Sequence, residues 1–225
     1  PFIYFVDTLT TNQQYPAIFR NRIVYQDYAE FEGQFDWDIW SADVWMKNNI
    51  QYEAVSAVIG INEQRPAVWE DWIAWHEDSG DGGNQDIYIM NLTEPESLRR
   101  VTLDTNTQIN PDIDEHLLVW QDYRNDNWDI YGYNRITGTE FQITTDIADQ
   151  INPTISDRFV AWEDLRDGVS NIYLADLAGY SEAAGCFVPL AGDADGNCQI
   201  NMADFVNLAQ NWMLCNLEPV DACNP

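Results

Sequence analysis

The feature that most constrains this fold is a unit of sequence that occurs four times. Each unit starts at a proline (Pro16, Pro66, Pro111 or Pro153), and an apolar stretch then ends in an aromatic residue, one further residue and an acid, as in Trp120-Gln-Asp122. After a polar loop come a second apolar stretch, such as Asp129-Ile-Tyr131, and a last one at 140–144. Four short strands in a unit of this length are typical of one β-propeller blade, so the chain is predicted to be an all-β propeller of four four-stranded blades.

The beginning of the chain matches the end of a unit. The segment 2–16 aligns without gaps with 52–66, 97–111 and 139–153, which lead up to the later repeat prolines, whereas the last unit stops after Asp176 with only three strands. Residues 2–8 are therefore predicted to be the outer strand of the last blade, because an unpaired strand edge leaves backbone donors and acceptors exposed. The same pairing would close the ring within one chain, or link neighbouring chains if the strand came from another copy.

Charge and composition exclude several classes of function. The chain has 38 acidic and 10 basic residues, a net charge of −28, which opposes binding to nucleic acids and to anionic membrane surfaces. The sequence has no apolar run long enough to cross a bilayer, so no membrane span is predicted. Aromatic residues make up 13% of the chain, which favours a β-rich core.

The aromatic–acid motif continues with an arginine in the third and fourth units. Its residues are Trp120, Asp122 and Arg124, and Trp162, Asp164 and Arg166. We expect the tryptophans to pack between sheets and each Asp–Arg pair to fix the turn after the second strand. With its proline and Asp-Ile-Tyr landmarks, the pattern over residues 2–178 resembles the TolB-type propeller repeats of secreted and periplasmic bacterial proteins. The first two units lack the arginine, and such relatives typically have six or more blades, which leaves closure of a four-blade ring open.

The most specific chemistry lies near the C-terminus, at 193–204. Oxygen-bearing side chains or a backbone carbonyl fall at positions 1, 3, 5, 7, 9 and 12 of this loop: Asp193, Asp195, Asn197, Gln199, Asn201 and Asp204. This spacing suits a hard cation with six to eight oxygen ligands and predicts a Ca²⁺ site, with Gln199 acting through its carbonyl. The alternative is an Asx-rich turn that caps the following helix. Cys198 stands where glycine is usual, and Asp204 replaces the usual glutamate.

The loop and its flanks resemble a single dockerin repeat, an EF-hand-like calcium module in which aspartate at position 12 is normal. The cysteine-bearing form is similar to C-terminal modules on secreted proteins of planctomycete-type bacteria. Full dockerins carry two repeats and bind cohesin domains. Only one repeat is visible here, at about 188–214, which leaves cohesin binding open.

The cysteines are confined to the C-terminal end of the chain: Cys186, Cys198, Cys215 and Cys223. Their even number and clustering predict disulfides formed in an oxidising compartment, with a thiolate metal site as the alternative. The pairing Cys198–Cys215 with Cys186–Cys223 is one of three. The predicted organisation is therefore a propeller over 1–178, a linker over 179–187 and a calcium module over 188–225.

These features favour a non-catalytic scaffold outside a bacterial cell, with the propeller as a platform for a protein or carbohydrate partner. The alternative is a homo-oligomeric filament built by strand addition between copies. A polysaccharide lyase or glycosidase is less favoured, because only analogy of fold supports it. The sequence contains no G-x-S-x-G or H-E-x-x-H motif, and we expect His76 and His116 at the surface or at blade edges.

Overall fold

The computed structural model describes residues 11–31, 34–46, 49–56, 58, 60–78 and 83–178. These residues form fifteen strands, and those up to Leu177 belong to one compact unit. The first sheet contains β1 (Asn12–Phe19), β2 (Arg22–Phe31), β3 (Gln34–Met46) and β4 (Asn49–Ser56). The second contains β5 (Glu63–Trp69), β6 (Trp72–Asp78), β7 (Gln85–Asn91) and β8 (Glu94–Arg100). The third contains β9 (Gln108–Asp114), β10 (Leu117–Asp122), β11 (Asp129–Asn134) and β12 (Thr139–Gln142), and the fourth β13 (Gln150–Ser156), β14 (Phe159–Asp164) and β15 (Asn171–Asp176).

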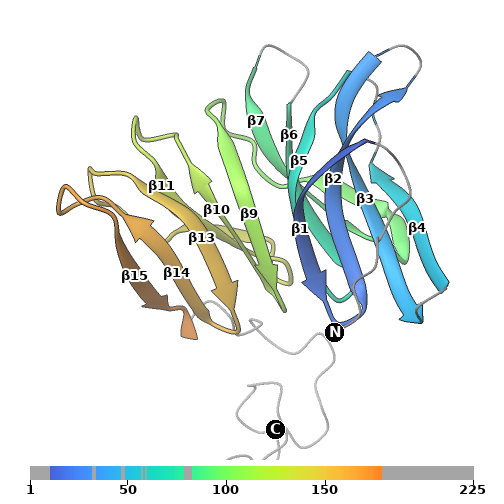
Figure 1. The fold of residues 1–225 in the computed structure, drawn as a ribbon. Coiled ribbons are helices and arrows are strands. Elements are labelled where there is room, and N and C mark those ends of the chain that lie inside the picture. Colours follow the sequence, from blue (N-terminus) through green and yellow to red (C-terminus); the bar gives the residue numbers. More distant parts are fainter. Residues whose placement is uncertain are drawn as a thin grey trace, which may run out of the picture. The chain divides into compact units, whose positions relative to one another are not determined.

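The strands of each sheet follow chain order and pair antiparallel. The first strands of successive sheets lie side by side, β1 against β5, β5 against β9 and β9 against β13, and the sheets fan out from them (Figure 1). This is the blade arrangement of a β-propeller, and the predicted all-β class is confirmed. Three sheets have four strands, and the last has three within the described part of the chain. Residues 2–8, the predicted fourth strand, lie outside the described residues, as do the linker and the predicted calcium module.

The core lies between neighbouring sheets rather than inside any one of them. Each of three apolar clusters combines an isoleucine from the third strand of one blade with an aliphatic residue from the first strand of the next. These pairs are Ile39 with Val68, Ile87 with Ile113, and Ile130 with Ile155. The repeat landmarks are therefore the residues that join blades, and burying them away from water favours the stacked arrangement.

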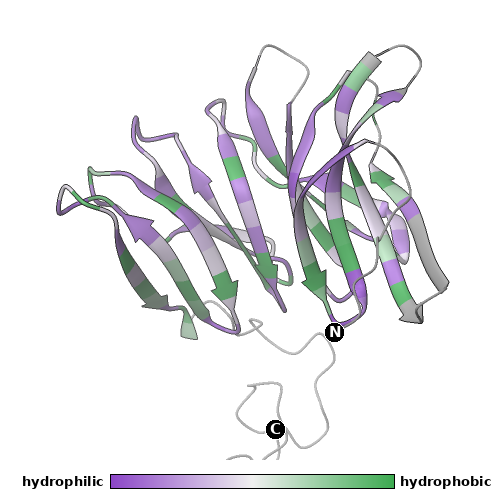
Figure 2. Cartoon of the chain, in the orientation of Figure 1, coloured by the Kyte–Doolittle hydropathy of each residue, from purple (hydrophilic) through white to green (hydrophobic). Residues whose placement is uncertain are grey.

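The tryptophan of the second strand completes each cluster. Trp75, Trp120 and Trp162 are 0%, 0% and 6% exposed, and each stacks on a tyrosine of the adjacent third strand with ring centroids 6.2–6.4 Å apart. Figure 2 shows hydrophobic residues mainly along the strands and hydrophilic residues at many of the connecting loops. Among the described residues, none forms a helix long and apolar enough to cross a membrane.

Candidate binding site at the propeller axis

The four innermost strands share an unusual backbone turn at the residue before the repeat proline. These residues are Tyr15, Arg65, Asn110 and Asn152, with φ of 50°, 55°, 55° and 52°. In each blade the pairing of the first and second strands shifts register at this point. A left-handed residue before proline is disfavoured, and such positions cost on the order of 1–3 kcal/mol unless their surroundings hold them in place. A bulge of this kind turns the side chain to a new direction.

A hydrogen bond from the preceding blade holds each of the last three turns. The donor is the backbone N–H of the residue before the repeat proline. The acceptor is a side chain of the preceding blade, at the position between the aromatic residue and the acid of its motif. The three bonds are Arg65 to Gln26 Oε1 at 2.9 Å, Asn110 to His76 Nδ1 at 3.3 Å, and Asn152 to Gln121 Oε1 at 3.0 Å. The strained turns are thus anchored across every described blade interface.

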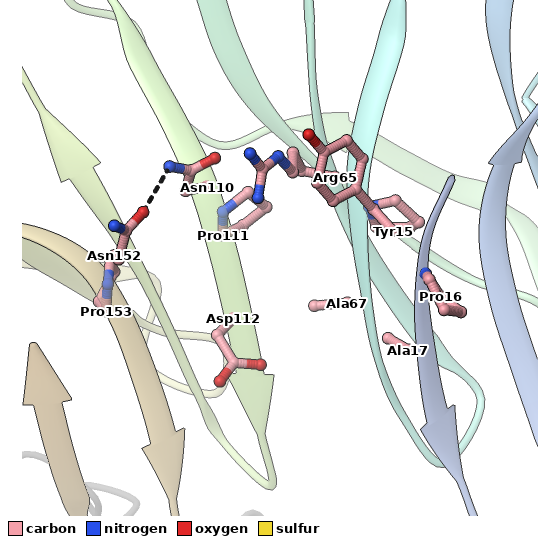
Figure 3. A pocket seen from close by; sticks show the side chains of 11 residues that line it. Tyr15, Pro16, Ala17, Arg65, Ala67, Asn110, Pro111, Asp112, Asn152 and Pro153 are labelled. Carbon is pink, nitrogen blue, oxygen red and sulfur yellow. Dashed lines mark hydrogen bonds between the residues drawn. The ribbon is translucent and has the colours of Figure 1, made fainter. Parts of the chain in front are cut away.

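These turns line a hollow of about 490 Å³ at the axis (Figure 3). The guanidinium carbon of Arg65 lies 3.6 Å from the centroid of the Tyr15 ring. Across the hollow, Asn110 Nδ2 donates to Asn152 Oδ1 at 3.3 Å. A planar cation on an aromatic face beside primary amides is suited to binding a carboxylate or another planar acceptor.

The lining also includes Asp112, which is already engaged. Its Oδ2 accepts hydrogen bonds from Thr154 Oγ1 at 2.7 Å and from the backbone of Ile155 at 2.9 Å. Asp112 therefore joins the third blade to the fourth. Arg65 is the basic residue of this lining, and Asp112 is its acidic residue.

His76 is buried on β6, an inner strand of its sheet, which corrects the expectation of a position at the surface or at a blade edge. Its side chain is 4% exposed, and burial, with a smaller effect of the nearby Arg65 charge, lowers its pKa to about 3. The ring is therefore neutral at physiological pH and accepts the Asn110 N–H. His116 lies in the turn after β9 with Nε2 3.5 Å from a carboxylate oxygen of Glu115.

The aromatic–acid–arginine motif forms a closed network within its own blade. Asp122 is fully buried and accepts from Trp120 Nε1 at 3.0 Å. It also accepts from the backbone N, Nε and Nη2 of Arg124 at 3.0, 3.0 and 2.6 Å. The guanidinium lies 4.1 Å from the centroid of the Tyr131 ring and also donates to Glu140 at 2.6 Å. These bonds fix the polar turn after β10.

The fourth blade repeats this network. Asp164 accepts from Trp162 Nε1 at 3.0 Å and from Arg166 Nε at 2.8 Å. Hydrogen bonds from Arg166 are the main cause that lowers the pKa of Asp164 to about 2. Each of the six motif residues therefore lies in a turn-anchoring network, away from the axis hollow.

The first two blades lack that arginine, and two of their buried acids are perturbed. Burial, with smaller effects of Asp36 and Asp27, raises the pKa of Asp38 to about 6. Burial likewise raises the pKa of Glu63 to about 8, although Glu63 accepts a 2.6 Å bond from Ser56 Oγ. In the second blade Arg100 Nη2 donates to Asp86, the repeat equivalent of Asp129, at 2.8 Å.

The sequence predicts a metal site in the C-terminal loop, and a thiolate site at the four cysteines is its alternative to disulfides. Over the described ranges, no group of three or more His, Cys, Asp or Glu side chains could hold a metal ion. Two predicted sets lie outside these ranges: the calcium ligands Asp193, Asp195, Asn197, Gln199, Asn201 and Asp204, and the cysteines Cys186, Cys198, Cys215 and Cys223.

No family model and no curated protein matches this chain. Among solved structures, TolB from Acinetobacter baumannii superposes with a TM-score of 0.58 at 18% identity, covering 76% of this chain and 43% of that one. A putative TolB from Agrobacterium tumefaciens superposes with a TM-score of 0.55 at 15% identity, covering 71% of this chain and 58% of that one. A third match is the β-propeller domain of the Trilobed protease from Pyrococcus furiosus, which is described as having an open velcro topology. It superposes with a TM-score of 0.53 at 13% identity, covering 80% of this chain and 55% of that one.

These similarities confirm the predicted TolB-like propeller at the level of fold. The chain spans about half the length of the structures it matches. The resemblance to a dockerin repeat stays a prediction.

Proposed function

We propose that this chain is a non-catalytic binding protein and that the propeller axis receives a carboxylate-bearing segment of a protein partner. The observation that supports the proposal is the Arg65 guanidinium, stacked on Tyr15 and placed across the hollow from the Asn110–Asn152 amide pair. A guanidinium whose plane is already set by an aromatic ring loses less conformational entropy when it forms two parallel bonds to a carboxylate. The strained turns that present these side chains also agree with a functional role, since such strain collects at ligand sites.

The buried groups that resemble catalytic ones already have structural partners. His76 accepts a backbone hydrogen bond from the next blade, and Asp122 and Asp164 accept from the tryptophan and arginine of their own motifs. This commitment to structure favours binding over catalysis.

The test measures binding of immobilised acetylated peptides of equal length. One set contains aspartate or glutamate, and a matched set contains asparagine or glutamine at the same places. We expect acidic peptides to bind the wild-type chain and the Arg99→Ala variant, and Arg65→Ala to lose at least tenfold in affinity. Arg99 is a matched control because it is exposed, on β8. Equal affinity of Arg65→Ala and wild type, or binding of oligogalacturonate in place of peptides, would contradict the proposal.

We also propose that residues 188–225 bind one Ca²⁺ and form a dockerin-like module that attaches the propeller to its partner outside the cell. The support is the spacing of oxygen ligands in the loop and the clustering of the four cysteines. So small a segment is expected to depend on metal and disulfides for its stability.

A second candidate function is a filament subunit joined by strand addition. It is favoured by the last sheet, in which the described residues form three strands up to β15, whereas they form four in each of the other sheets. In this case residues 2–8 of one copy would pair with β15 of another. Deletion of residues 1–10 should then reduce the native particle to a monomer, and an unchanged mass after deletion would exclude this function.

A further inference from the structure

A second hollow, of about 320 Å³, lies next to the axis hollow. The stacked Tyr15 and Arg65, drawn in Figure 3 on the axis hollow, border this one as well. None of the described residues that line it is acidic, and apart from Arg65 they are uncharged, which suits a neutral polar ligand. Its volume is at the lower end of the range for small-molecule pockets, about 300–1,000 Å³. We call it the amide hollow, because four glutamines line it: Gln14, Gln26, Gln64 and Gln85.

Two cross-strand pairs supply polar groups to the amide hollow from neighbouring blades. Gln14 on β1 pairs with Gln26 on β2, and Gln64 on β5 pairs with His76 on β6. Residues paired across two antiparallel strands project from the same face of the sheet, so each pair presents two polar side chains together. In the third and fourth blades an isoleucine takes the first-strand position of the pair. This arrangement is therefore specific to the first two blades.

Gln26 and His76 each keep a donor after their structural bonds are made. They are 1% and 4% exposed, and each uses its acceptor atom for a backbone N–H of the next blade. A neutral imidazole that accepts at Nδ1 carries its hydrogen on Nε2, so His76 keeps an N–H donor there, and Gln26 keeps its amide NH₂ group. Neither donor has an acceptor among the described residues. Donors on such buried side chains need water or a ligand to accept their hydrogens.

The other three glutamines of the amide hollow present complete amide groups. The side chains of Gln14, Gln64 and Gln85 have no hydrogen-bond partner within the described part of the chain. Each amide donates at its nitrogen and accepts at its oxygen. A hydroxyl group also donates and accepts, so neighbouring hydroxyl groups of a sugar can be bound by such amides at both ends.

Trp37 adds a flat apolar surface to the same lining. It is half-buried and holds the repeat position of Gln85, directly before the acid of the third strand. Its ring centroid lies 5.1 Å from that of Tyr28, so the ring is supported from one side. An indole ring is a suitable platform for the C–H face of a sugar, because it offers a large apolar contact area.

We propose that the amide hollow binds one or two units of an uncharged saccharide. Its hydroxyl groups bond the glutamine amides, its other oxygen atoms accept from Gln26 and His76, and a sugar face packs on Trp37. This site goes beyond the proposed carboxylate site, since its ligand carries no charge and neither Gln85 nor Trp37 lines the axis hollow. Each of the two proposals can therefore fail without the other.

The test measures binding of uncharged disaccharides to the full chain by saturation-transfer difference NMR. The probes are cellobiose, mannobiose, galactobiose and di-N-acetylchitobiose. We expect at least one of them to bind the wild type, and Gln64→Ala and Gln85→Ala to lose about tenfold in affinity each, as for the loss of one or two hydrogen bonds. Urea unfolding should be unchanged in Gln85→Ala, because its amide bonds no described residue. Gln13→Ala, at an exposed position on β1 outside the amide hollow, is the control and should bind as the wild type does.

A second pair of variants tests the aromatic platform. Trp37→Leu should weaken sugar binding about as much as Gln85→Ala. Trp128 is its matched control, because it holds the same repeat position in the third blade and lies 5.1 Å from Tyr123, yet does not line the amide hollow. Trp128→Leu should therefore keep the affinity of the wild type. The proposal is overturned if none of the four sugars binds, if Gln85→Ala binds as tightly as the wild type, or if Trp128→Leu loses as much as Trp37→Leu. An uncharged acetylated peptide that binds more tightly than every sugar, and is lost in Gln85→Ala, would assign the hollow to peptides instead.

Discussion

The Nδ1 atom of His76 lies 3.3 Å from the backbone nitrogen of Asn110 and accepts its hydrogen. Glutamine side chains fill the same role in the neighbouring blades, Gln26 for Arg65 and Gln121 for Asn152. A histidine in this series acts as a hydrogen-bond acceptor, and protonation of Nδ1 would abolish the bond.

Replacing His76 with glutamine should therefore keep the contact and remove its pH dependence. The pKa of His76 is lowered to about 3 in the folded chain, so in acid the unfolded chain binds the proton more readily. The stabilisation is complete above the ordinary histidine pKa of about 6.5 and is lost as the pH falls towards 3. Between pH 7 and pH 4.5 the wild type should lose about 2 kcal/mol more unfolding free energy than His76→Gln, measured by urea titration. His116→Gln is the control, and an equal loss in wild type and His76→Gln would contradict the assignment.

Glu63 gives the opposite dependence on pH. Burial raises its pKa to about 8, so the folded chain holds the proton more tightly than the unfolded chain. The penalty of the buried charge is full above pH 8, falls as the pH falls, and vanishes below about 4.5. Glu63→Gln restores the residue found at positions 13, 108 and 150, and should raise the unfolding free energy by about 1–3 kcal/mol at pH 8.5 and hardly at all at pH 4.5. Glu94→Gln, at an exposed site, should change neither value. Destabilisation at pH 8.5 would show that the charged form is needed.

Removing the guanidinium of Arg124 should leave a buried carboxylate without its main partner. Asp122 is fully buried and receives three hydrogen bonds from Arg124, two of them from the guanidinium. We expect Arg124→Ala to lower the unfolding free energy by about 2–4 kcal/mol, and Arg124→Lys to recover only part, since an ammonium cannot form the paired bonds. The loss of stability is measured by thermal unfolding of these variants, with Arg99→Ala as the control. A loss in Arg124→Ala no greater than in Arg99→Ala would mean that water replaces the guanidinium.

The sequence predicted the blades because its strongest landmarks are the residues that the blades bury between them. For this reason every unit has an aromatic residue at the position of Trp120 and an isoleucine at the position of Ile130. Exposure could not be predicted in the same way, since Ile172 looks like Ile130 in sequence, yet Ile172 is 74% exposed and Ile130 is buried, with no further blade packed on Ile172 within the described part of the chain. The axis site was also missed. Tyr15 and Arg65 belong to residue types with no preference for left-handed backbone, and the role of His76 depends on a partner in another unit. The available signal for the left-handed turns was the asparagine before two of the four repeat prolines.

Removal of calcium should affect the C-terminal module and spare the propeller. The predicted loop supplies its ligands through carboxylates such as Asp193 and Asp195, and an acidic loop without its cation repels itself. We expect a chelator to make residues 186–225 sensitive to protease while a fragment of residues 1–178 persists, as followed by mass spectrometry. The Asp193→Asn/Asp195→Asn double variant should behave like chelated wild type, and Asp221→Asn like the untreated chain. Equal resistance with and without chelator would argue for the helix-capping turn.

Gly132 on β11 tests how tightly the third blade is packed. A Cβ at this position would lie 2.7 Å from Phe141 Cζ and 3.3 Å from Ile143 Cδ1, although the equivalent residues in other blades are Ser41, Ile89 and Leu174. Alanine in a strand normally stabilises relative to glycine, but here the ring must move, so Gly132→Ala should cost about 1–2 kcal/mol in urea unfolding. In a Phe141→Leu background the same change should cost less, because the smaller side chain leaves room and the two effects are coupled. Gly168→Ala is the control, because its cost comes from a φ of 75° rather than from a neighbouring side chain. Its cost in unfolding free energy should be the same in the Phe141→Leu background. Equal costs of Gly132→Ala in both backgrounds would mean that the ring is not the obstacle.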